Sequence, residues 1–163
     1  MTPRYGRAPR GQRVRGAVPR NHGHNTTLIA ALRADGMGPV MTIAGAADGP
    51  AFVAYVREFL VPTLRPGQIV VLDNLAVHRN AAARRLIEAR GCRLLFLPPY
   101  SPDFNPIEHA FSKLKECLRR AGARTRDALE AAIADALAAI TSADARGWFR
   151  RCGYPLAEAQ PLC

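Results

Sequence analysis

Residues 70–74 read Val-Val-Leu-Asp-Asn, and residues 98–108 read Pro-Pro-Tyr-Ser-Pro-Asp-Phe-Asn-Pro-Ile-Glu. The first segment places Asp73 at the end of a short apolar strand, and the second places Glu108 on the first turn of a helix after the next strand. Functional groups of parallel sheets gather at the carboxyl ends of the strands, so the two carboxylates are expected to converge on one site. Two-metal phosphoryl-transfer sites are built from such carboxylates, with the ions about 3.5–4 Å apart.

The composition describes one folded and strongly basic domain. The chain has 163 residues, of which 48% are hydrophobic and 22% are charged, as is typical of a globular protein with a core of ordinary size. Its net charge of +10 indicates a polyanionic partner, and nucleic acid is the first candidate. A merely solvated basic surface is the alternative, since a GC-rich coding bias would also raise the arginine content.

Several classes of protein and site are disfavoured by the sequence. The four cysteines have no pairwise metal spacing and are expected to be reduced thiols, and His22 and His24 have no further ligands nearby to form a zinc site. No apolar run approaches the roughly 20 residues of a membrane span. The arginine-rich start lacks the apolar region of a signal peptide, so we expect a cytoplasmic protein without a membrane partner.

The order of elements predicts an α/β fold with parallel late strands. We expect an antiparallel hairpin of strands 26–32 and 39–43, a helix over 50–62, buried parallel strands at 68–72 and 93–97, and helices at 79–90 and 105–121. Thr125 should cap a further helix, and Thr141 should begin a last short one with a capping box. The apolar face of the first helix should consist of Phe52, Val53, Val56, Phe59 and Leu60. Residues 1–25 are expected to form an extended basic arm, 26–152 the folded domain, and 153–163 a tail.

Asp73 also has an ordinary structural interpretation, because aspartate after a strand often caps a turn or the following helix. Asn74 and His78 favour the functional interpretation, since they keep polar and metal-compatible groups at the same strand end. A histidine in that place would otherwise be structural or exposed.

Glu108 also has a well-defined structural interpretation as an alternative to a functional role. Asn105 at the N-cap, Pro106 at the first helical position and Glu108 at the third spell a capping box, in which the glutamate only satisfies a backbone N–H. That alternative predicts a surface helix start, whereas the functional one predicts a carboxylate that points toward Asp73. Three prolines between residues 98 and 102 rigidify the turn, which suits a helix start that must be held in place.

The two segments together resemble a known family. The pattern L-D-N-x-x-x-H, followed by L-P-P-Y-S-P-D-F-N-P-I-E-H, is similar to the core of the mariner-like DDE transposase superfamily, in particular its bacterial insertion-sequence branch. Residues 5–11 and 64–67 match this branch as well, so the resemblance covers essentially the whole chain. It implies an RNase H-like fold and an endonuclease and strand transferase that cuts and joins DNA with two magnesium ions held by three acids. Asp73 would be the second acid and Glu108 the third.

The sequence departs from the family at its start. The family's first acid lies before the segment that matches residues 5–11, and neither Asp35 nor Asp48 occupies its place. We therefore expect the C-terminal part of the catalytic domain, an RNase H-like mixed sheet flanked by helices and lacking its first, central strand. Such a fragment should bind Mg²⁺ or Mn²⁺ only weakly and be inactive alone. It would depend on an upstream-frame polypeptide or a full-length transposase, and a homo-oligomer is left open.

The remaining expectations concern DNA. Asn74, His78 and Asn105 should support the two acids, and the predicted DNA contacts are Arg4, Arg7, Arg10, Arg13, Lys113, Lys115, Arg119 and Arg120. The leading hypothesis is a transposase catalytic-domain fragment, and the alternative is a non-catalytic nucleic-acid-binding protein. A nucleotide-binding α/β enzyme ranks last, because no glycine-rich phosphate loop follows any strand.

Overall fold

The computed structural model describes residues 6–15 and 25–156. Its first structural unit is an antiparallel hairpin of β1 (Thr26–Arg33) and β2 (Gly36–Ala44), which confirms the expected hairpin. The strands are longer than expected because the turn is tight: β2 already begins at Gly36, whose φ of 137° few other residues adopt. An irregularity between Ala30 and Leu32 shifts the register of β1.

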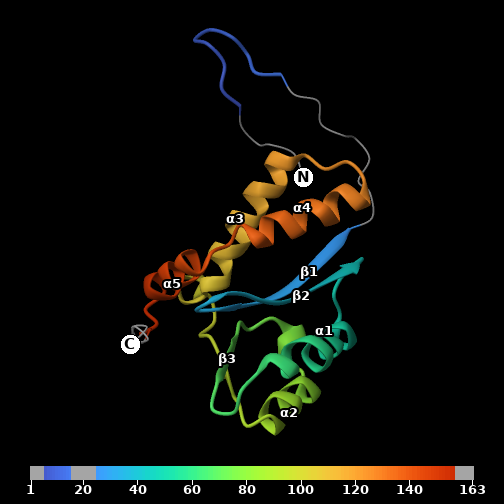
Figure 1. The fold of residues 1–163 in the computed structure, drawn as a ribbon, viewed down its shortest axis with the longest axis vertical. Helices are drawn as coiled ribbons and strands as arrows, with labels where there is room; N and C mark the ends of the chain where they lie inside the picture. Colours follow the sequence, from blue (N-terminus) through green and yellow to red (C-terminus); the bar gives the residue numbers. More distant parts are fainter. Residues whose placement is uncertain (1–5, 16–24, 157–163) are drawn as a thin grey trace, which may run out of the picture.

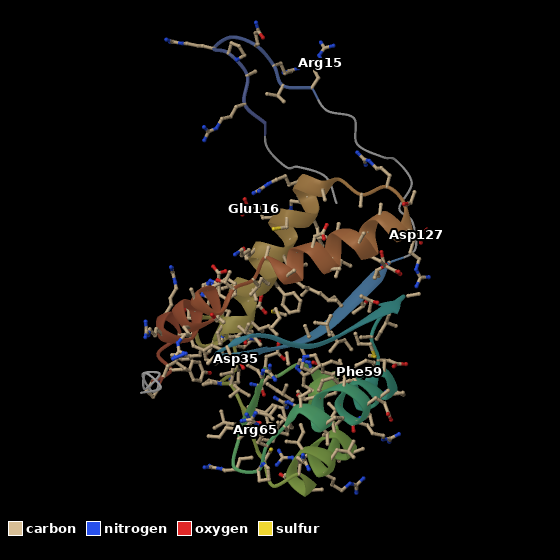
Figure 2. All side chains as sticks on the ribbon, viewed as in Figure 1. Arg15, Asp35, Phe59, Arg65, Glu116 and Asp127 are labelled. Atoms are coloured by element: carbon tan, nitrogen blue, oxygen red, sulfur yellow. The ribbon has the colours of Figure 1, made fainter. Side chains whose placement is uncertain are left out.

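The first helical segment begins as α1 (Gly49–Tyr55) and continues as the π-helical turn η1 (Val56–Leu60) and the 3₁₀ turn η2 (Val61–Thr63). Asp48 caps it by accepting a hydrogen bond from Ala51 N at 2.9 Å. The expected inward face is wrong at Phe59, which is 40% exposed (Figure 2). The π turn changes the angular spacing of the side chains, so Phe59 turns outward, whereas Leu60 is buried as expected.

The second unit is a parallel strand pair with one crossover. It consists of β3 (Ile69–Leu72), the 3₁₀ turn η3 (Ala76–Arg79), α2 (Ala81–Ala89) and β4 (Arg93–Phe96). The parallel pairing is confirmed, with Leu72 opposite Phe96. The expectation that the first of these strands is fully buried is wrong, because Ile69 is 53% exposed.

The described strands do not form one sheet. β1 pairs with β2 and β3 pairs with β4, which gives two separate two-stranded sheets, one antiparallel and one parallel. Within the described residues, β1 and β3 are not hydrogen-bonded to each other. Antiparallel and parallel pairs together with helices agree with the expected mixed α/β fold.

Three helices complete the fold: α3 (Pro106–Ala121), α4 (Arg126–Ala138) and α5 (Ser142–Arg151). Gly122 ends α3 with a φ of 59°, in the left-handed region that favours glycine. The caps predicted from sequence are confirmed: Thr125 caps α4, and Thr141 forms a capping box with Asp144 at the start of α5.

The hairpin separates two apolar cores (Figure 1). One core lies between α1, η1 and α2 and includes Ile29 of β1 at its edge. The other lies between α3 and α4 and includes Leu28 of β1. Successive residues of a strand point to opposite faces, so β1 contributes a side chain to each core. In the described parts of the chain, no helix is long and apolar enough to span a bilayer.

Lys113 joins α3 to the start of α5. Its ammonium donates hydrogen bonds to Ala139 O at 2.9 Å and to Asp144 Oδ2 at 2.7 Å. The backbone N–H and the hydroxyl of Thr141 donate to the same carboxylate oxygen. Lys113 foremost, and then Thr141, lower the pKa of Asp144 to about 2.

Asp144→Asn should therefore destabilise the protein in a pH-dependent way. A carboxyl whose folded pKa is depressed stabilises the protein above its unfolded pKa, near 4, and loses that contribution as the pH falls toward 2. We expect the variant to lose about 1 kcal/mol of unfolding free energy at pH 6 and the difference from wild type to shrink toward pH 2. Urea unfolding across this range measures it. Asp135→Asn, at an exposed site on α4, is the control, and an equal loss at both pH values would contradict the prediction.

Candidate active site

Asp73 follows β3 directly and is held in a defined conformation. Its Oδ1 accepts a hydrogen bond from Leu75 N at 3.0 Å and lies 2.6 Å from Nδ1 of His78. The hydrogen bond from Leu75 N is the turn-capping contact that the ordinary structural interpretation of Asp73 predicts. Both contacts use Oδ1 and the side chain is 34% exposed, so Oδ2 is available to a ligand.

His78 connects Asp73 to the core. Its ring lies 4.8 Å from the ring of Phe52, centroid to centroid, at an interplanar angle of 44°. Phe52 is 3% exposed, which makes it a rigid support for the imidazole. His78 therefore restrains the orientation of the Asp73 carboxylate.

Asn74 ties the ends of the two parallel strands together. Its amide nitrogen donates to Leu97 O, and its amide oxygen accepts a hydrogen bond from a terminal guanidinium nitrogen of Arg79 at 2.8 Å. Leu97 precedes the proline-rich turn that leads to Glu108. Asn74 thus fixes the distance from the end of β3 to the start of that turn.

Glu108 lies on the first turn of α3 and is exposed. The capping box expected as the alternative is not formed through Asn105, whose side chain makes no capping hydrogen bond. Asn105 and Glu108 instead line one pocket of about 250 Å³ together with Asp73 and Asn74. The structure therefore brings the two predicted acids to the same pocket, from the end of β3 and from the start of α3.

The walls of this acid pocket, which we define by Asp73 and Glu108, come from the proline-rich turn. Pro98, Tyr100 and Pro102 line it, and the turn closes with a 3₁₀ segment, η4 (Pro102–Phe104). Tyr100 has a φ of 56°, which is rare for a residue with a side chain, and its side chain is fully exposed. The hydroxyl of Tyr154 donates a hydrogen bond to Phe104 O at 2.8 Å, so the segment after α5 also holds this turn.

The donor set of the acid pocket suits a hard divalent cation. Mg²⁺ takes oxygen ligands and is usually held by one or two carboxylates, with water in its other positions. Asp73 and Glu108 meet that requirement for one ion. In the part of the chain that the structure describes, no three His, Cys, Asp or Glu side chains gather as a metal site.

The predicted DNA contacts fall into three groups. Arg7, Arg10 and Arg13 are exposed, and Arg4 lies outside the described residues. Lys115 and Arg120 are exposed on α3, where Arg120 pairs with Glu116 at 3.0 Å, and Arg119 is half-buried. Lys113 differs from them, because its ammonium is engaged by Asp144 and Ala139.

A second pocket, of about 300 Å³, lies beside the acid pocket and was not predicted from the sequence. Asn74 lines both pockets, and the other residues of the second one are Arg79, Asn80, Arg84 and Phe96. The sequence does contain the residues of this pocket close together, but their pattern is ambiguous. Arg79 and Asn80 directly follow His78, and Arg84 lies one helical turn later, but a surface helix often carries arginines.

Comparison with known families identifies the class of protein. The family model described as DDE superfamily endonuclease matches residues 1–130, and the chain belongs to this family. A comparison with the curated proteins finds no match.

Solved structures with a similar fold include complexes of Mos1. The Mos1 strand transfer complex superposes with a TM-score of 0.69 at 18% identity, over 93% of this chain and 46% of that one. The Mos1 mariner paired-end complex with Mn gives a TM-score of 0.66 at 19% identity, over 90% and 46%. This chain thus spans about half the length of these proteins. The family model confirms the expected membership of the DDE superfamily, and the superpositions confirm the expected fold.

Proposed function

We propose that this chain forms part of the catalytic domain of a DDE transposase and acts on phosphodiester bonds of DNA. The observation that carries the proposal is the acid pocket, in which Asp73 from a strand end and Glu108 from a helix start face the same space. Family membership supports it, since the family is one of endonucleases. The structurally similar proteins include a pre-cleavage Mos1 transpososome and a Mos1 strand transfer complex.

Asp73 and Glu108 would hold Mg²⁺ or Mn²⁺. Such an ion, when bound, activates a water or a 3′-hydroxyl as nucleophile and stabilises the leaving oxygen. The protein's own contribution is positional. His78 orients the Asp73 carboxylate, Asn74 joins the strand ends, and the proline-rich turn sets the start of α3, so both acids are placed before the substrate arrives.

We propose that full activity requires a further carboxylate. Within the described residues the acid pocket holds two, which suits one weakly bound ion better than a two-metal site. The polypeptide predicted from the sequence, an upstream-frame product or a full-length transposase, would supply the missing acid. β1 and β3 each pair with one described strand, so each has an unpaired edge to which a strand from such a partner could add.

DNA is the proposed partner. The net charge of +10 and the exposed arginines at positions 7, 10 and 13 support binding to phosphates without strong sequence preference. Lys115, Arg119 and Arg120 would contribute from α3. We leave Lys113 out of this surface, because its contacts with α5 already engage its ammonium.

Binding of Mn²⁺ to the purified chain tests the proposed function. We expect saturable binding, measured by calorimetry, that Glu108→Gln weakens at least tenfold, since a carboxylate ligand to the ion is lost. Asp103→Asn is the matched control, because Asp103 is an acid on η4, shortly before α3, and does not line the acid pocket. Equal Mn²⁺ affinity of Glu108→Gln and wild type would contradict the proposal. DNA binding without Mn²⁺ binding would then favour the alternative, a non-catalytic nucleic-acid-binding protein.

A further inference from the structure

The second pocket, which we call the arginine pocket, combines two arginines with an aromatic ring, and no acid lines it. Arg79 and Arg84 supply guanidinium groups, Asn74 and Asn80 supply amides, and Phe96 forms an apolar wall. A small concave site of about 300 Å³ is large enough for a ligand group rather than for water alone. Its lining has positive charge and hydrogen-bond donors, which together select an anion.

Both arginines are held in place before any ligand binds. The guanidinium of Arg79 donates to Asn74 Oδ1 at 2.8 Å. The guanidinium carbon of Arg84 lies 5.7 Å from the centre of the Phe96 ring, within the range of a cation–π contact. Side chains that are already ordered lose less conformational entropy on binding, so they bind more tightly.

Among the described residues, the acid that contacts these arginines is Glu88, and it is a weak competitor. Glu88 accepts a hydrogen bond from Arg84 at 3.4 Å, and the two side chains are 48% and 49% exposed. Exposed ion pairs of this kind, four residues apart on a helix, contribute only about 0.3–0.5 kcal/mol. A phosphate can displace this contact, since guanidinium groups bind phosphate oxygens through two parallel hydrogen bonds.

The position of the pocket identifies the anion. Asn74 lines both pockets, so the arginine pocket and the acid pocket adjoin at this residue. A DNA strand whose phosphodiester lay at Asp73 and Glu108 would run past this boundary. We propose that Arg79 and Arg84 bind a backbone phosphate of the same DNA strand, next to the phosphodiester in the acid pocket, with Phe96 as the positioning residue for Arg84. This inference rests on the proposed function.

The test compares Arg84→Gln with Arg85→Gln in the full chain. Arg85 is the next residue of α2, is also exposed, and does not line the pocket, so both variants lose one charge from the same helix. We expect Arg84→Gln to weaken binding of a labelled DNA duplex about tenfold, the effect of one charge-assisted hydrogen-bonded contact. It should also lower the slope of log affinity against log salt by about 0.9, as one lost phosphate contact does, whereas Arg85→Gln should leave the slope unchanged.

Two further measurements separate the possible outcomes. Phe96→Leu should weaken binding in wild type and have no added effect in Arg84→Gln, because Phe96 acts through that arginine. Inorganic phosphate at constant ionic strength should compete for the pocket and so weaken DNA binding by wild type more than binding by Arg84→Gln; equal weakening of both would show that these arginines hold no phosphate, and the proposal would fail. Equal effects of Arg84→Gln and Arg85→Gln would overturn the arginine pocket alone. Absence of DNA binding by the unaltered chain would contradict the proposed function itself.

Discussion

Replacing Ile87 with alanine should lower the free energy of unfolding by about 3 kcal/mol. Ile87 is fully buried in the core between α1, η1 and α2, where Phe52, Val56 and Ala83 are also buried. Truncation removes apolar surface from that core and leaves a cavity that the surrounding helices fill only in part. The total stability of a domain is roughly 5–15 kcal/mol, so the loss is a large share of it.

Urea unfolding monitored by circular dichroism measures this loss. Ile69→Ala is the control, because it is the same substitution at a residue that is 53% exposed, and it should cost well under half as much. If both variants lost the same stability, the core described around Ile87 would be wrong.

Replacing His78 with alanine should weaken Mn²⁺ binding about 10- to 100-fold, the usual effect of removing a group that orients a metal ligand. In wild type, Nδ1 of His78 lies 2.6 Å from the Asp73 carboxylate, and the ring rests against Phe52. Without the imidazole, Asp73 is freer to rotate and must be ordered by the ion at a cost in affinity. Calorimetric titration of the folded variant with Mn²⁺ measures the change.

His109→Ala is the matched control for this experiment. His109 follows Glu108 on α3, and its ring stacks toward Trp148 at 6.5 Å instead of lining the acid pocket. Its removal should leave Mn²⁺ affinity nearly unchanged. A variant His78→Ala with wild-type affinity would show that Asp73 does not depend on the imidazole for its orientation.

Features set by a few neighbouring residues could be predicted from the sequence. The caps at Thr125 and Thr141, the hairpin and the parallel strands follow from turn chemistry and apolar patterning. The two acids were predicted because one lies at a strand end and the other at a helix start. The sequence also allowed a capping box at Asn105, which the structure does not form, because the same pattern is compatible with an Asn105 side chain that lines a pocket.

Features that depend on packing could not be predicted. The π turn after Tyr55 changes which side of the helix Phe59 occupies, and helical periodicity carries no signal for such a turn. Lys113 looked like its basic neighbours on α3, but it engages Asp144, which is distant in sequence. The arginine pocket depends on β4 lying beside α2, which places Phe96 under Arg84.

The alternation of side chains along β1 has a consequence for dissecting the protein. Leu28 packs with α3 and α4, and Ile29 packs with the opposite core, so both cores depend on the same hairpin. The proline-rich stretch after β4 looks like a linker. Cutting there would remove α3 and α4, so Leu28 and the other apolar side chains on that face of the hairpin would be exposed to water. Fragments that end at that stretch would expose apolar surface and tend to aggregate. The two halves are therefore not independently folding modules.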